Sequence, residues 1–199
     1  MLSDKVLRNA LIVLAVLLFL VYVWKPLRQL NNPLTVTNDF VVETVDGVLD
    51  SKQLRGKVLA VTLAYGNCAE ECAGRLGRLA KGYQALPAQD RSMVRVILVS
   101  VDPDRDTPRS MAAYAKRFDA EMIGATAKPE NLKVLADGFG ATYEKMQATP
   151  DGTYRVEHHP AFFLVDAEGH FASVINANVT PEAVAQALRA KLPAVLPPS

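Results

Sequence analysis

The chain has 199 residues, of which 50% are hydrophobic and 22% are charged, and its formal net charge is +1. This composition excludes an intrinsically disordered chain and argues against a nucleic-acid-binding protein. About 160 residues remain once an N-terminal apolar segment is set aside, which is enough for one domain with its own core. The two cysteines of so large a domain are not the disulfide framework of a small secreted protein.

An uncharged apolar run from residue 10 to residue 24 predicts a membrane-directed segment. The run is shorter than the roughly 17–25 residues of a spanning helix, but apolar neighbours extend it, and Tyr22 and Trp24 suit a membrane interface. The alternative is a cleaved signal peptide, yet residues 21–26 are bulky and offer no small-residue cleavage site. We therefore expect an uncleaved transmembrane helix at 9–27 behind a short cytoplasmic N-terminus at 1–8.

The segments around this anchor set the expected location and domain limits. No Arg- and Ser-rich transit segment precedes the apolar run, which favours a bacterial inner membrane with the following domain facing the periplasm. Residues 28–38 are polar and lack a helical period, as in a tether. The folded domain is expected at 39–193, with a tail at 194–199. It opens with a short hairpin that turns at Asp46-Gly47.

Residues 58–65 form an apolar run that ends just before the two cysteines. Eight mostly apolar residues without polar alternation predict a central strand buried on both faces. Gly66 and Asn67 indicate a turn, and the apolar residues that follow Cys72 recur at helical spacing. The cysteines are therefore expected at a strand-to-helix junction, where the helix N-terminus favours the thiolate while Glu70 and Glu71 oppose it.

Cys68 and Cys72 are four residues apart, which places them on one face if the first helical turn includes both. Their Cβ atoms would then lie about 5–6 Å apart, close enough for a disulfide or for binding one soft metal ion. The alternative is a pair of small buried hydrophobic residues, because free cysteine is often buried. The polar turn and the adjacent glutamates argue against that alternative.

Alternating strand and helix patterns continue after the cysteine helix. Residues 94–101 are rich in β-branched residues and predict a second strand. An acidic turn follows, in which Asp106 or Thr107 is the expected N-cap of a helix with Pro108 at its first position. Another helix is expected at 129–139. This alternation indicates βαβ units around a mainly parallel sheet.

The last third of the chain carries a second group of reactive residues, His158-His159-Pro160. It precedes an apolar strand at 161–165, a turn at Glu168-Gly169, a strand at 171–175 and a helix from Pro181 to Leu192 with Thr180 as its N-cap. Ligands of α/β sheets gather at strand ends, so this turn is well placed to face the cysteines. Either His158 or His159 could be a ligand, and Pro160 could be an ordinary trans proline.

Four stretches together resemble the Sco/SenC family of membrane-anchored copper proteins with a thioredoxin-like fold. They are Gly56-Lys57 before the central strand, the Cys-x-x-x-Cys motif from Cys68 to Cys72, the Ser-x-Asp-Pro-x-x-Asp-Thr-Pro loop from Ser100 to Pro108, and Val156-Glu157-His158 in the position of the family's Val-Asp-His. The similarity covers about residues 39–191. It implies an α/β fold with a thioredoxin-like central sheet flanked by helices.

The resemblance also implies a function and a set of ligands. It implies that Cys68, Cys72 and His158 bind copper, and that the protein is a metallochaperone assisting assembly of a respiratory oxidase, whose copper-receiving subunit would be its partner. Two thiolates and one imidazole are a soft donor set that suits Cu(I) and can hold Cu(II), whereas structural zinc would need a fourth protein ligand.

Other functions are also consistent with the sequence. Ala69 and Ala73 stand where the family usually has proline, and Pro160 resembles the cis proline at a strand entry of thiol-disulfide thioredoxins. A membrane-anchored thiol-disulfide oxidoreductase would use Cys68 to attack an exchange partner and Cys72 to resolve the mixed disulfide. A peroxidase is less consistent, because Tyr65 lies where peroxiredoxins carry threonine or serine. An interaction module without cysteine chemistry is a further alternative.

Overall fold

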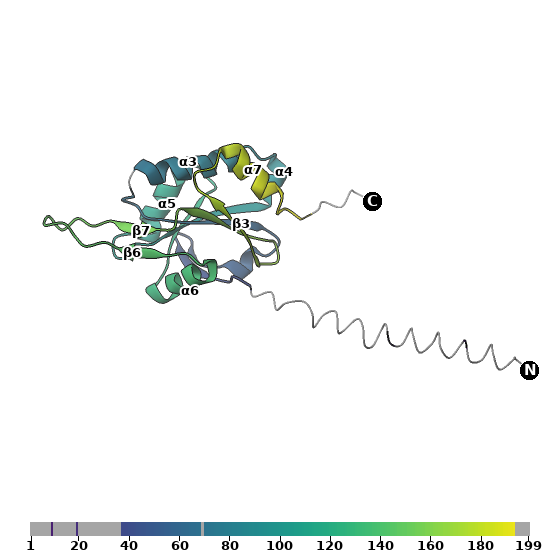
Figure 1. Cartoon of the computed structure of the whole chain (residues 1–199), viewed down its shortest axis with the longest axis horizontal. Helices are drawn as coiled ribbons and strands as arrows, with labels where there is room; N and C mark the ends of the chain where they lie inside the picture. The colour runs from purple at the N-terminus through teal and green to yellow at the C-terminus, as the bar shows by residue number, and fades with distance from the viewer. Residues whose placement is uncertain (1–8, 10–18, 20–36, 69, 194–199) are drawn as a thin grey trace, which may run out of the picture. The chain divides into compact units, whose positions relative to one another are not determined.

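The computed structural model describes residues 9, 19, 37–68 and 70–193 (Figure 1). The predicted anchor, the cytoplasmic N-terminus and the tail at 194–199 fall outside this part, apart from the isolated positions 9 and 19. None of the helices among the described residues is long and apolar enough to span a bilayer. The predicted anchor therefore stays a prediction.

A seven-stranded sheet in the order β2-β1-β5-β4-β3-β8-β9 forms the centre of the described domain. Its strands are β1 (Val41–Thr44), β2 (Gly47–Asp50), β3 (Val58–Ala64), β4 (Val94–Ser100), β5 (Ile123–Thr126), β8 (Ala161–Val165) and β9 (Phe171–Asn176). The predicted apolar run becomes β3, which is buried along its whole length between β4 and β8. The helices are η2 (Ser51–Leu54), α3 (Glu70–Gln84), α4 (Ala88–Ser92), α5 (Pro108–Lys116), α6 (Pro129–Phe139) and α7 (Pro181–Arg189).

The sheet is mixed, which corrects the expectation of a mainly parallel one. Strand β4 pairs in parallel with β3 and with β5, but every other strand pair in the sheet is antiparallel. Connection length explains two of the antiparallel pairs: β1–β2 and β8–β9 are joined by short turns, which can link only antiparallel neighbours, whereas parallel strands need a crossover such as α3. The pairs β1–β5 and β3–β8 join strands that are far apart in the chain.

Alternate residues of β3 enter two cores on opposite faces of the sheet. Val58, Ala60 and Ala64 pack with residues of α3, α5 and α7, while Leu59 and Val61 pack with residues of α6. Helices α3 and α7 lie side by side on their face (Figure 1). Burial on both faces explains why the sequence of β3 shows no polar alternation. The end of this strand, where the cysteines follow, is thereby fixed to the core.

A separate two-stranded hairpin carries the histidine motif. Strand β6 (Tyr143–Lys145) pairs with β7 (Val156–His158), and the hairpin projects away from the main sheet (Figure 1). The sequence did not predict either strand, because the residues between them, 146–155, are polar and mostly exposed. The register places His158 opposite Tyr143, at the root of the hairpin.

Helix boundaries agree with the predicted caps in most places. Thr107, rather than Asp106, is the N-cap of α5, and it forms a capping box with Ser110. Thr180 caps α7 as expected, but this helix ends at Arg189, three residues earlier than predicted. Asp106 does not cap the helix, and its carboxylate instead accepts a hydrogen bond from the backbone N–H of Gly66.

Candidate metal centre

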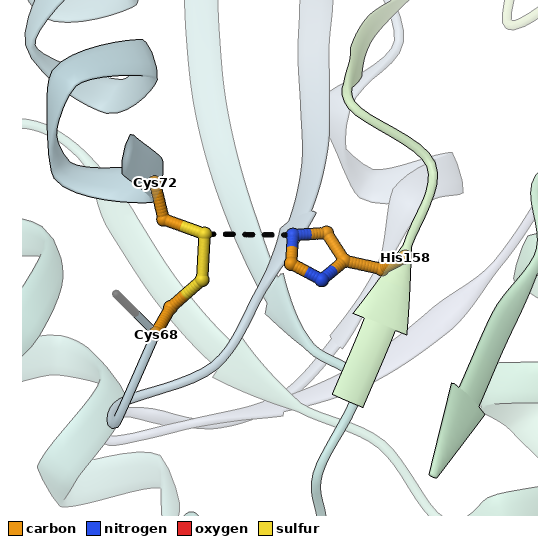
Figure 2. Close-up of side chains that lie close together, drawn as sticks. All are labelled: Cys68, Cys72 and His158. Carbon is orange, nitrogen blue, oxygen red and sulfur yellow. Dashed lines mark hydrogen bonds between the residues drawn. A yellow bond between two sulfur atoms is a disulfide. The ribbon is translucent and has the colours of Figure 1, made fainter. Parts of the chain in front are cut away.

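The two cysteines lie on a tight turn that joins β3 to α3. Tyr65 follows β3, its carbonyl accepts a hydrogen bond from the backbone N–H of Cys68 (3.0 Å), and α3 begins at Glu70. Cys68 and Cys72 are joined by a disulfide, with their Cα atoms 5.9 Å apart (Figure 2). The predicted strand-to-helix junction is confirmed, and the chain is described in its oxidised state.

The two sulfur-bearing residues differ in exposure. Cys72 is only 7% exposed because it lies in the first turn of α3 against the core, whereas Cys68 is half-buried on the turn. A partner molecule or an entering metal ion therefore reaches Cys68 more easily. Thiol-disulfide exchange depends on such access as well as on the thiolate fraction.

His158 lies at the end of β7 and points at the disulfide (Figure 2). Its Nε2 atom is 3.7 Å from the Sγ atom of Cys72. Its Nδ1 atom is 3.1 Å from the carbonyl oxygen of Val156. Because a carbonyl only accepts hydrogen bonds, Nδ1 carries the proton in this arrangement, and the lone pair of Nε2 is directed toward the sulfur. This is the tautomer that a metal-binding imidazole needs.

The surroundings of His158 keep the imidazole neutral. Burial lowers the pKa of His158, and the positive charge of Arg75 lowers it further, while the hydrogen bond to Val156 partly offsets both effects. Arg75 reaches this place from α3, and it lines a small pocket together with Cys72, His158 and Pro160. A neutral imidazole can bind a metal ion without first losing a proton.

Of the two neighbouring histidines, only His158 joins the cysteines. The ring of His159 instead lies 5.8 Å from the ring of Phe163, and its backbone N–H donates a hydrogen bond to the carbonyl of Thr142. The ligand atoms of Cys68, Cys72 and His158 all lie within 4.8 Å of one another, and within the described residues this is the only such group of three Cys, His, Asp or Glu side chains. The peptide bond before Pro160 is trans, unlike that of the thioredoxin strand entry.

Asp106 holds the cysteine turn in place, a role that the sequence did not reveal. Its Oδ2 atom accepts hydrogen bonds from the backbone N–H of Gly66 (3.0 Å) and from the hydroxyl of Ser100 (2.5 Å). Ser100 ends β4 and is fully buried, so the turn is tied to the neighbouring strand. The Asp-Thr-Pro sequence indicated a helix cap there, but nothing in it indicated a partner 40 residues away.

Tyr65 is a second residue of this site that sequence reasoning did not identify. Its ring is 4% exposed and meets the ring of His158 edge to face, with ring centroids 5.9 Å apart. The guanidinium of Arg105 lies over Tyr65, with its Cζ atom 5.7 Å from the ring centroid. The imidazole is thus held between the sulfurs and an aromatic ring.

A sequence model of the SCO1/SenC family matches residues 28–193, which is most of the chain. The chain belongs to the SCO1/SenC family. The resemblance drawn from its motifs is thereby confirmed, and the three motifs around the site, the cysteine turn, the loop after β4 and His158, lie together in space.

Relatives in this family are distant in sequence. The chain is 25% identical over 147 residues to the mitochondrial protein SCO2 of Saccharomyces cerevisiae and 29% identical over 127 residues to the mitochondrial SCO1 homolog 1 of Arabidopsis thaliana. The first match covers 73% of this chain and the second 64%. The chain spans only 49% and 38% of the lengths of these two relatives.

Solved structures of the family share the fold. The copper-bound ScoI of Bradyrhizobium japonicum is 29% identical, with a TM-score of 0.70 over 79% of this chain and 99% of that protein. The apo Sco1 protein of Thermus thermophilus is 32% identical, with a TM-score of 0.70 over 77% of this chain and 90% of that protein. The expected thioredoxin-like α/β fold of the domain is confirmed.

Proposed function

We propose that this chain is a copper metallochaperone that binds copper through Cys68, Cys72 and His158. The observation that carries the proposal is the convergence of two sulfur atoms and one unprotonated imidazole nitrogen within 4.8 Å. The similarity to the Bradyrhizobium japonicum ScoI, which was solved with copper bound, supports copper as the metal. Copper is here the cargo, to be received and passed on.

The donor set agrees with this cargo. Two thiolates and one imidazole are soft ligands that favour Cu(I) and can hold Cu(II). A structural zinc site would need a fourth protein ligand, which the described residues do not offer at this place. Binding requires that the disulfide first accept two electrons from a thiol reductant, because only the freed thiolates are metal ligands.

The recipient of the copper is proposed to be a subunit of a respiratory cytochrome oxidase. BsSco, a solved protein with this fold, is a member of the Sco family of cytochrome c oxidase assembly proteins. Membership of the same family supports a similar client for this chain. The half-buried Cys68 gives such a partner access to the copper, since it is more exposed than Cys72.

The cellular location of the protein is proposed from its sequence. We infer a single-pass anchor at 9–27, a tether at 28–38 and a domain at 39–193 that faces the periplasm of a bacterial inner membrane. The apolar run, which ends in Tyr22 and Trp24, supports the anchor. Protease treatment of intact spheroplasts should remove the domain, whereas protection of the domain would place it on the cytoplasmic side.

A second candidate function is thiol-disulfide exchange, favoured by the disulfide and by the greater exposure of Cys68. The Cys68 thiolate would attack a partner disulfide, forming a mixed disulfide and expelling one partner thiolate. The Cys72 thiolate would then attack the Cys68 sulfur, which restores the Cys68–Cys72 disulfide and releases the second partner thiolate. Two electrons pass from this chain to the partner.

Copper titration of the full-length chain distinguishes the two candidates. The reduced chain should bind one equivalent of Cu(II) with thiolate-to-copper charge-transfer absorption, and the oxidised chain should bind far less. His158→Ala should lose this absorption, while the matched variant His159→Ala should keep it, because His159 faces Phe163 instead. A reduced chain that binds no stoichiometric copper, but reduces a protein disulfide unless Cys68 is replaced by serine, would establish the oxidoreductase.

A further inference from the structure

The loop between β4 and α5 contacts the hairpin at Tyr154, four residues before His158. The Tyr154 hydroxyl donates a hydrogen bond to the Oδ1 atom of Asp102 at 2.9 Å. The Cζ atom of Arg105 lies 3.6 Å from the centroid of the Tyr154 ring, and its Nη1 atom donates to the Tyr154 carbonyl at 3.1 Å. Ring, hydroxyl and backbone of one residue are therefore all held by the loop.

This loop is itself fixed to the main sheet. Asp102 is 3% exposed, and its backbone N–H donates to the Ser100 hydroxyl at the end of β4. Its second carboxylate oxygen forms an ion pair with the Nε atom of Arg105. An ion pair with further hydrogen bonds has a defined geometry, and here the buried Asp102 carboxylate would lose much if its partly exposed partner Arg105 were removed. Asp102 and Arg105 thus offer a rigid surface to the hairpin.

The hairpin's own backbone bonds do not fix His158 to the cysteines. The β6–β7 ladder and the bond from His159 to Thr142 lie within the 142–159 segment, so they hold the hairpin together without tying it to α3. Arg105 instead bridges both sides: it stacks on Tyr154 of the hairpin and lies over Tyr65, whose ring meets His158.

We propose that Asp102, Arg105 and Tyr154 form a latch that positions the His158 imidazole beside the two sulfur atoms. These three residues, the Tyr154 latch, act through His158 and touch neither sulfur. The copper part of this inference rests on the proposed function. Loss of residues that orient a metal ligand typically lowers metal affinity by about 10–100-fold.

Two variants of the full-length chain test the latch. Tyr154→Phe removes the hydroxyl and keeps the ring, and Arg105→Gln removes the cation and its ion pair. Arg189→Gln is the control, because it also removes a cation from an ion pair, but Arg189 ends α7 and pairs with Asp90 of α4, away from the hairpin and the loop. In the reduced chain, the first two variants should bind Cu(II) about 10-fold more weakly and shift the charge-transfer absorption, while the control binds as wild type.

A second readout does not depend on copper. In the oxidised chain, the short-range NOE between the ring protons of Tyr65 and His158 should be present in wild type and in Arg189→Gln, and weakened in Tyr154→Phe and Arg105→Gln. An NOE unchanged in both latch variants would overturn the latch, whether or not copper binds. If wild type shows the NOE and the latch variants lose it, but no form binds copper, the latch stands and the proposed function fails.

Discussion

Replacing Asp106 with alanine should loosen the cysteine turn and destabilise the domain measurably. Two hydrogen bonds are lost at once, from Gly66 and from the fully buried Ser100, and both converge on the same carboxylate oxygen. Hydrogen bonds to a charged group contribute about 1.5–3 kcal/mol each, and Asp106 is only half-buried, so water replaces part of the loss. We expect a decrease of about 3 kcal/mol in the free energy of unfolding.

The assay is thermal unfolding of the full-length chain, followed by circular dichroism with the disulfide intact. For a domain of this size, about 3 kcal/mol corresponds to a decrease in Tm of about 6–12 °C. Asp106→Asn should lie in between, because an amide oxygen can accept both bonds but neutral bonds are about half as strong. Asp104→Ala is the control, since its exposed pair with Lys145 contributes less than about 1 kcal/mol. A loss in Asp106→Ala no larger than in this control would refute the reasoning.

Further predictions concern the histidine and the packing of the sheet. The pKa of His158 is lowered in the folded chain, so below about pH 6.5 the unfolded chain binds more protons than the folded chain does. The free energy of unfolding should therefore decrease as the pH falls below about 6.5, until the pH passes the pKa of His158 in the folded chain. His158→Gln should lack this component of the urea-unfolding profile. Arg75→Gln should raise the pKa of His158 in an NMR titration, whereas Arg78→Gln, whose guanidinium binds the Ala177 carbonyl, should leave it unchanged. Gly124→Ala should cost about 3 kcal/mol or more in unfolding free energy, because the added Cβ would overlap the backbone of Met111. A Gly124→Ala chain as stable as wild type would show that α5 can shift away from β5.

The parts of the fold that depend on local pattern could be predicted from the sequence. The burial of β3, the start of α5 and the cysteine position at a strand-to-helix junction all follow from composition and caps within a few residues. The mixed sheet could not be predicted in this way, because strand direction depends on which distant strands pair. Strand β5, with the short sequence Ile-Gly-Ala-Thr, is recognisable only through its pairing with β4 and β1.

The candidate site, like the fold, could be predicted only where a local sequence pattern determines it. Cys68 and Cys72 could be singled out from their spacing, but the residues alone did not decide between His158 and His159. Which of the two side chains faces the cysteines depends on where strand β7 ends and on its register, here the pairing of its last residue, His158, with Tyr143. Asp106 fitted the local rules for a helix cap equally well as Thr107, and only the folded chain shows its contact with Gly66.

The site has three donor atoms, the two cysteine sulfurs and one histidine nitrogen, and their spacing along the chain also matters for biosynthesis. The disulfide joins residues separated by four positions, whereas 86 positions separate Cys72 from His158. A nascent or partly unfolded polypeptide can therefore close the disulfide, because the loop is short and needs no sheet. The three donors come together only when residues far apart in the chain have been brought into contact, and such non-local contacts are slow to form. Oxidation can thus precede folding in this chain, whereas a metal ion can meet all three donors together only once the chain has folded.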